Sequence, residues 1–146
     1  MAQTTTIELE YLMTLQGTLQ QPQTIDAGNL IFGVTGGWAE GPKIKAKVVG
    51  PGGDWAQFLP SGVGRLDVRA TLVTDDDQLI FISYNGVADF KLNGTPDVPY
   101  IAIAPTFRTS SEKYAWLNHL QAVGKMVQRS TEPENRFIRY EIFAVR

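Results

Sequence analysis

The clearest β-strand pattern in the sequence is Lys43-Ile44-Lys45-Ala46-Lys47-Val48. Its three apolar residues alternate with three lysines, so apolar side chains occupy one face of the strand and charged side chains the other. A face made of lysine belongs in solvent, and the opposite face belongs against a core. The segment therefore predicts a half-buried strand.

Similar short alternating segments recur along the chain, separated by Gly, Pro, Asn and Asp. Besides 43–48, the strand candidates are residues 7–19, 30–35, 63–74, 79–85, 100–108 and 137–145. Turn signals lie at residues 26–29, 50–53, 60–62, 75–77 and 93–94. A capping-box pattern at 109–112 predicts one short helix near residues 112–118, followed by another strand.

About eight or nine strands with so little helix would leave exposed edges in an open sheet, so a sheet of this length curls or closes. We therefore expect an all-β fold: a single closed or nearly closed antiparallel β-barrel of about eight or nine strands with at most one short helix. Residues 1–146 form one domain of ordinary size. Barrels of about eight strands can hold one small ligand.

The amino-acid composition limits the partners and the kinds of chemistry that we expect of this protein. The net charge of −2 argues against nucleic acid and anionic membranes as partners. Cysteine is absent and His119 is the only histidine, which excludes disulfides, thiolate nucleophiles and multi-histidine metal sites. We expect no metal and no cofactor, and chemistry that depends on carboxylates, arginine and tyrosine. The N-terminus has no signal-peptide pattern and no apolar run reaches membrane-spanning length, so the cytoplasm is the expected location.

The strand candidates on either side of the acidic turn at 75–77 predict a hairpin. If the connection has two or four residues, Asp67 and Arg69 share a face with Ile82 and Tyr84. One interpretation of this mixed face is a solvated charge ladder. The other is a held ion pair in a partly apolar cavity, where it could orient a ligand or move a proton. A connection of three or five residues would reverse the pairing.

Several motifs resemble one known family. They are Gly36-Gly37-Trp38-Ala39-Glu40-Gly41-Pro42, Gly52-Gly53-Asp54-Trp55, Leu66-Asp67-Val68-Arg69-Ala70-Thr71-Leu72, Phe107-Arg108-Thr109, Tyr114-Ala115-Trp116-Leu117-Asn118 and Val123-Gly124. In this order they resemble domain-of-unknown-function family 3237 (UPF 0311-type proteins) over nearly the whole chain. Asp77 stands where the family usually has Gly, and residues 87–98 form a compressed segment. The resemblance implies a barrel similar to those of allene oxide cyclases and dirigent proteins, which bind apolar small molecules and steer cyclisation or coupling without a metal.

Two further carboxylates have two interpretations each. Glu40 has the same parity as Ile44, which places it on the inward face, where desolvation would suit it to acid–base work. It could instead accept backbone N–H bonds in the Gly-rich turn. Asp54 follows two glycines and either caps its own backbone or contacts a ligand in the cavity.

Aromatic and amide side chains complete the candidate site. We expect Trp38 and Trp116 in the cavity wall, although most tryptophans in a small domain are core or subunit contacts. Asn118 could offer its amide to a ligand carbonyl or end the short helix.

These residues suggest a cofactor-independent cyclase, isomerase or lyase acting on an apolar oxygenated or aromatic metabolite. Asp67 and Glu40 would be the acid–base groups, and Arg69 and Tyr84 would stabilise negative charge on oxygen. The alternative is a non-catalytic small-molecule carrier that uses the same cavity.

The 15 aromatic residues (7 Phe, 3 Trp and 5 Tyr) also predict an apolar outer patch, and therefore a homo-oligomer, most simply a dimer. Trp55 and Phe58 are the candidates for that patch.

Overall fold

The computed structural model describes residues 4–90 and 98–146, most of which lie in β-strands. The strands are β1 (Leu9–Leu19), β2 (Gln23–Asp26), β3 (Asn29–Gly41), β4 (Ile44–Phe58), β5 (Gly64–Thr74), β6 (Leu79–Asp89), β7 (Tyr100–Arg108), β8 (Ala122–Ser130) and β9 (Phe137–Val145). A single 3-10 turn, η1 (Ala115–His119), precedes β8 in this part of the chain.

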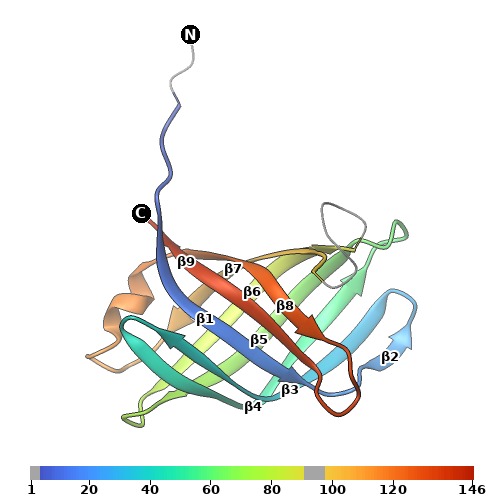
Figure 1. Cartoon of the computed structure of the whole chain (residues 1–146), viewed down its shortest axis with the longest axis horizontal. Helices are drawn as coiled ribbons and strands as arrows, with labels where there is room; N and C mark the ends of the chain where they lie inside the picture. The colour runs from blue at the N-terminus through green and yellow to red at the C-terminus, as the bar shows by residue number, and fades with distance from the viewer. Residues whose placement is uncertain (1–3, 91–97) are drawn as a thin grey trace.

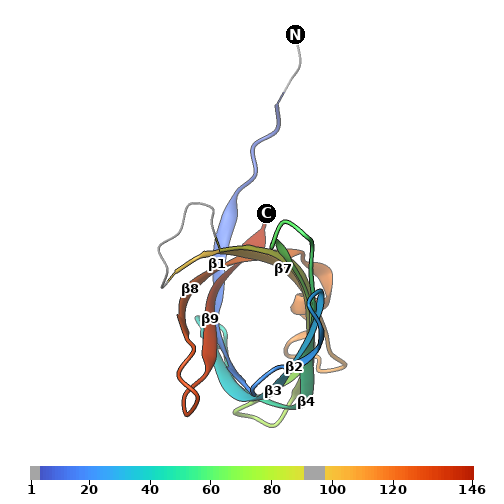
Figure 2. The ribbon, with the colours of Figure 1, turned by 90° about the vertical axis from the view of Figure 1, so that its right-hand side faces the viewer.

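The strands close into an antiparallel barrel. The sheet order is β1-β9-β8-β7-β6-β5-β4-β3-β2, and an additional pairing of β1 with β3 joins the sheet to itself. Eight strands thus form the barrel, and β2 lies outside it, paired only with β3 in the described residues (Figure 1). Figure 2 shows the strands as a ring. The all-β barrel expected from the sequence is confirmed.

Alternation along β4 follows the lysine-rich pattern. Ile44, Ala46 and Val48 are 4–5% exposed, while the lysines between them are exposed. Gly41 of β3 is opposite Ile44, so Pro42 and Lys43 form the connection between the two strands. A half-buried strand beginning at Ile44 is what period-two alternation predicts.

Other local predictions differ from the structure. Residues 50–53 are part of β4, not a turn: a register shift against β5 between Val49 and Gly53 absorbs the irregular segment, which includes a cis Gly50–Pro51 peptide. β2 has no counterpart among the predicted strands. The expected helix is only the 3-10 turn η1, which has no side-chain N-cap hydrogen bond, so the capping-box prediction is wrong. The expected turn at residues 93–94 lies outside the described residues.

Each end of the barrel has a different character. At one end, which we call the plugged end, Tyr114 and Leu117 from the η1 segment are 2% and 0% exposed and pack into the core. Asp76, in the β5–β6 connection, accepts hydrogen bonds there from Tyr114 (3.0 Å) and Lys113 (2.8 Å). The opposite end carries the β8–β9 connection and β2 (Figure 1). No helix in the described residues is both long and apolar enough to cross a membrane.

Candidate functional site in the barrel interior

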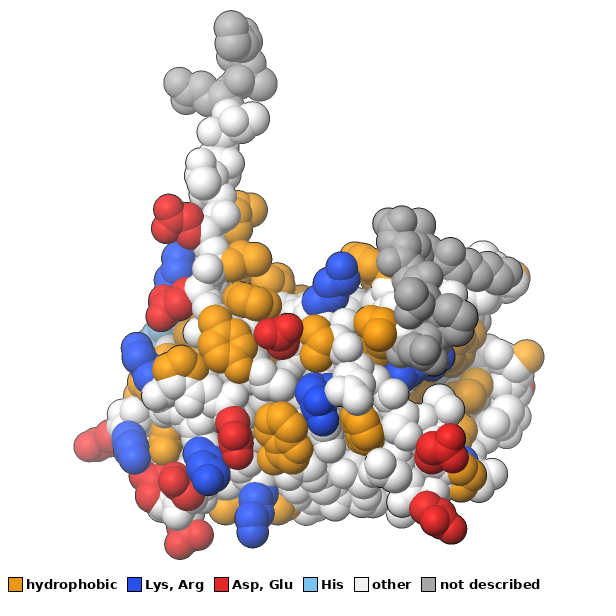
Figure 3. All heavy atoms as spheres, in the orientation of Figure 1, with side chains coloured by type: hydrophobic (Ala, Val, Ile, Leu, Met, Phe, Trp, Pro, Cys, Tyr) orange, Lys and Arg blue, Asp and Glu red, His pale blue; other side chains and the backbone are white. Residues whose placement is uncertain are grey.

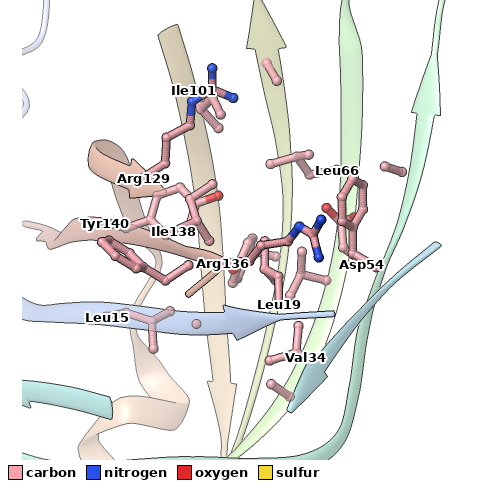
Figure 4. A pocket seen from close by; sticks show the side chains of 18 of the residues that line it. Leu15, Leu19, Val34, Asp54, Leu66, Ile101, Arg129, Arg136, Ile138 and Tyr140 are labelled. Carbon is pink, nitrogen blue, oxygen red and sulfur yellow. The ribbon is translucent and has the colours of Figure 1, made fainter. Parts of the chain in front are cut away.

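The half of the barrel away from the plugged end contains a cavity of about 410 Å³. Its wall is mostly apolar and includes the rings of Phe32, Phe58 and Phe137. The ionisable side chains among the described lining residues are those of Asp54, Tyr84, Tyr140, Arg129 and Arg136. We call the end of the barrel that carries Arg129 and Arg136 the arginine end (Figure 4). A cavity of this size and composition is typical of small-molecule sites.

Asp54 lies in the wall because β4 resumes inward alternation after its irregular segment. It is opposite Val68 of β5, and Val68 is opposite Tyr84 of β6, so the two side chains project inward on either side of Val68. One carboxylate oxygen of Asp54 accepts a hydrogen bond from the backbone N–H of Asp67 at 3.0 Å.

Burial gives the Asp54 carboxyl unusual acid–base behaviour. Desolvation raises its pKa from 3.8 to about 6, the negative charge of Asp67 adds to the rise, and the hydrogen bond from Asp67 opposes it. No salt bridge joins Asp54 to a basic side chain within the described residues. A carboxyl that titrates near pH 6 can accept and donate protons near neutral pH.

Tyr84 and Tyr140 meet inside the barrel. Their rings are 5.7 Å apart at 69°, an edge-to-face contact, and they are 8% and 2% exposed. Burial raises the pKa of both hydroxyls, and the charge of Asp54 raises both further. Both tyrosines therefore stay protonated; Tyr140 donates a hydrogen bond to Tyr84, which leaves the Tyr84 hydroxyl as the donor available close to the Asp54 carboxyl.

The expected cavity pair, Asp67 and Arg69, lies on the outer face of the barrel. The connection between Val73 and Leu79 has five residues (74–78), so even-numbered positions of β5 are opposite even-numbered positions of β6. The assumed register was therefore wrong. The Asp67 and Arg69 side chains are 44% and 58% exposed and meet at 3.5 Å. This is the solvated charge ladder of the first interpretation.

Glu40 and Trp38 also point outward, contrary to the parity argument for Glu40 and to the expectation that Trp38 lies in the cavity wall. The β3–β4 connection has two residues (42–43), so Glu40 is opposite Lys45 on the outer face and Ala39 is opposite Ala46 on the buried face. Upstream, a register shift between Gly33 and Trp38 moves the inward positions from the parity of Val34 to that of Ala39 and leaves Trp38 outside; Gly37, in this segment, has φ +128°. Glu40 is exposed. Trp38 lies under the Arg139 guanidinium, 5.6 Å from ring centroid to cation. Neither residue lines the cavity.

Trp116 and Asn118 lie near the plugged end and outside the cavity. Lys43 Nζ is 5.4 Å from the Trp116 ring centroid. The Asn118 side chain accepts a hydrogen bond from Thr109 N–H (2.8 Å) and donates one to Thr109 C=O (2.9 Å). Asn118 therefore fixes the segment before η1, and its amide is engaged by the backbone.

The structure thus brings Asp54 and Tyr84 together and separates them from the other predicted site residues. Sequence reasoning missed Tyr140, Arg129 and Arg136. Tyr140 could have been found, because it alternates with Ile138 and Ile142 on the apolar side of β9. Arg136 precedes β9, where no periodic pattern indicates direction.

Trp55 and Phe58, the two residues expected on an outer aromatic patch, lie on different faces of the barrel wall. Trp55 is 44% exposed on the outer surface, where Arg69 lies 5.4 Å from its ring centroid. Phe58 lines the cavity, so its expected outward position is wrong. No group of three or more His, Asp or Glu side chains in residues 4–90 and 98–146 is arranged to hold a metal ion.

Comparison with solved structures supports the same architecture. A β-barrel-like protein from Acinetobacter baumannii is 28% identical, with both chains covered in full and a TM-score of 0.83. A conserved protein of unknown function from Rhodopseudomonas palustris is 22% identical over 98% of this chain and 100% of its own, with a TM-score of 0.85. An enzyme from Penicillium herquei is 24% identical over 99% of this chain and 98% of its own, with a TM-score of 0.72.

No curated protein sequence gives a significant match to this chain. The family comparison is positive: residues 7–145 match the family described as "Protein of unknown function (DUF3237)". Because this match covers nearly the whole sequence, the chain belongs to the DUF3237 family.

Proposed function

We propose that the barrel binds a small, largely apolar molecule that carries an oxygen function, and that Asp54 moves a proton on it. The reaction class is cofactor-independent isomerisation, cyclisation or elimination. Asp54 takes the acid–base role that the sequence suggested for Asp67 and Glu40, since both of those lie outside the cavity. Tyr84 keeps its expected role and is joined by Tyr140.

The proposed step balances within one molecule. The Asp54 carboxylate accepts a proton from a carbon next to a carbonyl group, and the electron pair moves onto the carbonyl oxygen. A tyrosine hydroxyl donates a hydrogen bond to that oxygen and stabilises its charge. In isomerisation or cyclisation, the protonated Asp54 returns the proton to another atom of the same molecule, so the product is an isomer; in elimination, it gives the proton to the leaving group.

One observation carries the proposal: a carboxyl with a pKa of about 6 lies in an apolar cavity beside two buried, protonated tyrosines. Strongly shifted groups in a cavity are typical of sites that transfer protons. The enzyme from Penicillium herquei shares the fold and adds only that a barrel of this kind can host catalysis.

Nitrobenzisoxazole tests the proposal without knowledge of the natural substrate. A base removes the proton on C3 of the isoxazole ring, the N–O bond breaks, and a coloured cyanonitrophenolate forms. We expect the wild-type kcat/KM to rise with pH with a midpoint near that of Asp54, about 6. Asp54→Asn should lower kcat/KM by roughly a hundredfold, the lower range for loss of a general base.

Two glycine variants serve as matched controls. A Cβ at Gly17 would project into the cavity with only Val34 nearby, at 4.0 Å, so Gly17→Leu should fill the cavity and abolish turnover. A Cβ at Gly36 would lie beside Thr18 on the outer face, so Gly36→Leu should leave turnover unchanged. Equal rates for wild type and Asp54→Asn would contradict the catalytic proposal.

The second candidate is a non-catalytic carrier. The observation in its favour is the hydrogen bond from Asp67 N–H, which gives Asp54 a structural task within the β4–β5 ladder. A carrier would bind neutral apolar molecules with the same affinity after Asp54→Asn. Native mass spectrometry of molecules that co-purify with the protein would identify what it carries.

A further inference from the structure

The cavity lining carries charged groups of both signs. Among the described lining residues, Asp54 is the one acidic side chain, and Arg129 and Arg136 are the basic ones. No ion pair in this part of the chain joins Asp54 to either arginine. The described lining of the cavity therefore has one carboxyl and two guanidinium groups, and Figure 4 shows all three side chains.

A backbone hydrogen bond fixes the position of Arg136, while its side chain is available to contact a ligand. Its carbonyl oxygen accepts a hydrogen bond from Leu19 N–H at 3.0 Å, which ties the start of β9 to the end of β1. The guanidinium is half-buried in the cavity wall and makes no hydrogen bond or ion pair with another described residue. Arg129, on β8, packs over the Phe90 ring at 5.2 Å.

An arginine in this position is suited to anion recognition. Its planar guanidinium presents several N–H donors in a fixed arrangement that matches a carboxylate or phosphate. Desolvating it costs free energy, so an apolar cavity wall is an unfavourable place for it without an anionic partner.

The strand geometry gives the backbone separation between Arg136 and Tyr140. Tyr140 lies four residues beyond Arg136 along β9, about 13 Å at roughly 3.3 Å per residue. Barrel strands are tilted by roughly 40°, so the separation along the barrel axis is about 10 Å. A body of two or three fused rings, or a chain of similar length, spans this distance.

We infer that the ligand is an amphipathic organic anion whose charged group binds Arg136 at the arginine end and whose apolar body extends toward Asp54 and Tyr84. This inference rests on the proposed function and specifies its substrate class. The anionic end fixes the direction in which the molecule enters, because the plugged end is closed by Tyr114 and Leu117. The oxygen function that reacts then lies at the far end from the anion.

Two fluorescent probes of nearly the same shape test the inference: anilinonaphthalene sulfonate, an anion, and N-phenylnaphthylamine, which is neutral. We expect Arg136→Met to weaken sulfonate binding about tenfold, within the range for a hydrogen bond to a charged group, and to change binding of the neutral probe less than about twofold. Arg136→Lys should restore most of the lost affinity. Added salt should weaken binding of the sulfonate only.

Matched variants separate this inference from the proposed function. Arg65→Met removes the same charge from the exposed outer face and should change neither affinity. Gly17→Leu should abolish binding of both probes, and Gly36→Leu should preserve it. If Arg136→Met leaves the sulfonate affinity unchanged while Gly17→Leu still abolishes binding, anion recognition is wrong and cavity binding stands. If Gly17→Leu leaves both affinities intact, or neither probe binds the wild type, both proposals fail.

Discussion

Asp54 is the cavity residue whose ionisation burial opposes most clearly within the range of neutral pH. Its folded-state pKa of about 6 lies roughly two units above the ordinary 3.8. Each unit corresponds to 1.36 kcal/mol, so ionising this carboxyl costs the folded state about 3 kcal/mol relative to the unfolded chain. Because burial raises the folded-state pKa of Asp54, this residue contributes most to stability below its ordinary pKa of 3.8. That contribution is lost as the pH rises through about 6. A cost of this size is typical of a residue retained for function.

Asp54→Asn should therefore make the protein more stable at high pH. An amide oxygen can still accept the hydrogen bond from Asp67 N–H, while the cost of ionisation disappears. We expect a higher Tm than wild type at about pH 8, by the equivalent of up to about 3 kcal/mol, and nearly the same Tm at about pH 4. Thermal unfolding of wild type and variant, measured by circular dichroism between these two pH values, checks this prediction. A constant difference between the two proteins at every pH would contradict the account.

At the scale of single strands, the direction of each side chain depends on a few irregular positions. Gly37 of β3 has φ +128°, and a Cβ there would collide with the carbonyl of Gln16. This glycine lies in the segment where the inward positions change from the parity of Val34 to that of Ala39, which leaves Trp38 on the outer face. The positive φ and the close approach of β1 both require that no side chain be present.

Gly37→Ala should destabilise the barrel by more than about 2 kcal/mol, because it combines a strained backbone with a steric clash. Gly36→Ala is the matched control: its Cβ would meet only Thr18 Oγ1 at 4.0 Å, and its φ is not positive. Chemical denaturation of the two variants should give a large loss of unfolding free energy for the first and little change for the second. Equal losses would show that Gly37 has no special role.

The β5–β6 connection is the second irregular element. Asp76 accepts hydrogen bonds from Thr74 Oγ1 (2.6 Å), Lys113 Nζ (2.8 Å) and Tyr114 OH (3.0 Å), and so ties this connection to the segment that closes the plugged end. The hydrogen bond from Lys113, followed by that from Thr74, holds the pKa of Asp76 well below its usual range. Asp77 beside it adopts φ +63°, a left-handed conformation that glycine and, less often, Asn or Asp adopt.

Asp76→Asn should lower the Tm near neutral pH, because it removes the charge that the three donors stabilise. A depressed pKa contributes stability above the unfolded value of 3.8 and loses it as the pH falls further. The difference in Tm between wild type and variant should therefore shrink in acid. A difference that grows in acid would contradict this assignment.

The elements themselves could largely be predicted from the sequence, because alternation is a local property. Residues 43–48 alternate clearly, and β4 buries the expected side chains. The site could be predicted only in part, since which face of a strand points inward depends on the parity of connections and bulges. The five-residue β5–β6 connection placed Asp67 and Arg69 on the outer face, and the two-residue β3–β4 connection did the same for Glu40. Neither the number of residues in a connection nor the position of a bulge can be read from residue types alone.

At the scale of the whole molecule, the barrel divides its interior between packing and a cavity. The plugged end is filled by side chains such as Leu72, Ile80 and Leu117, all fully buried, and this packed half stabilises the fold. The other half leaves about 410 Å³ unfilled. Figure 3 shows hydrophobic side chains interspersed with charged ones on one outer face.

Exposed apolar side chains on the outer surface still favour self-association. Trp55, Leu79 and Phe81 are 44%, 63% and 42% exposed, and such residues are common in subunit contacts. We expect a homodimer in solution, and Phe81→Ser to weaken it. Light scattering that gives the monomer mass of 16.1 kDa at all concentrations would contradict a dimer.

The proposal depends most directly on the ionisation of Asp54 inside the cavity. Carbon-detected NMR of the side-chain carboxyl, assigned by comparison with Asp54→Asn, follows this ionisation as the pH is changed. The account requires a midpoint of about 6, set by burial of the carboxyl in the apolar wall. A midpoint near the ordinary value of 3.8 would show a solvated carboxyl and would contradict an acid–base role for Asp54.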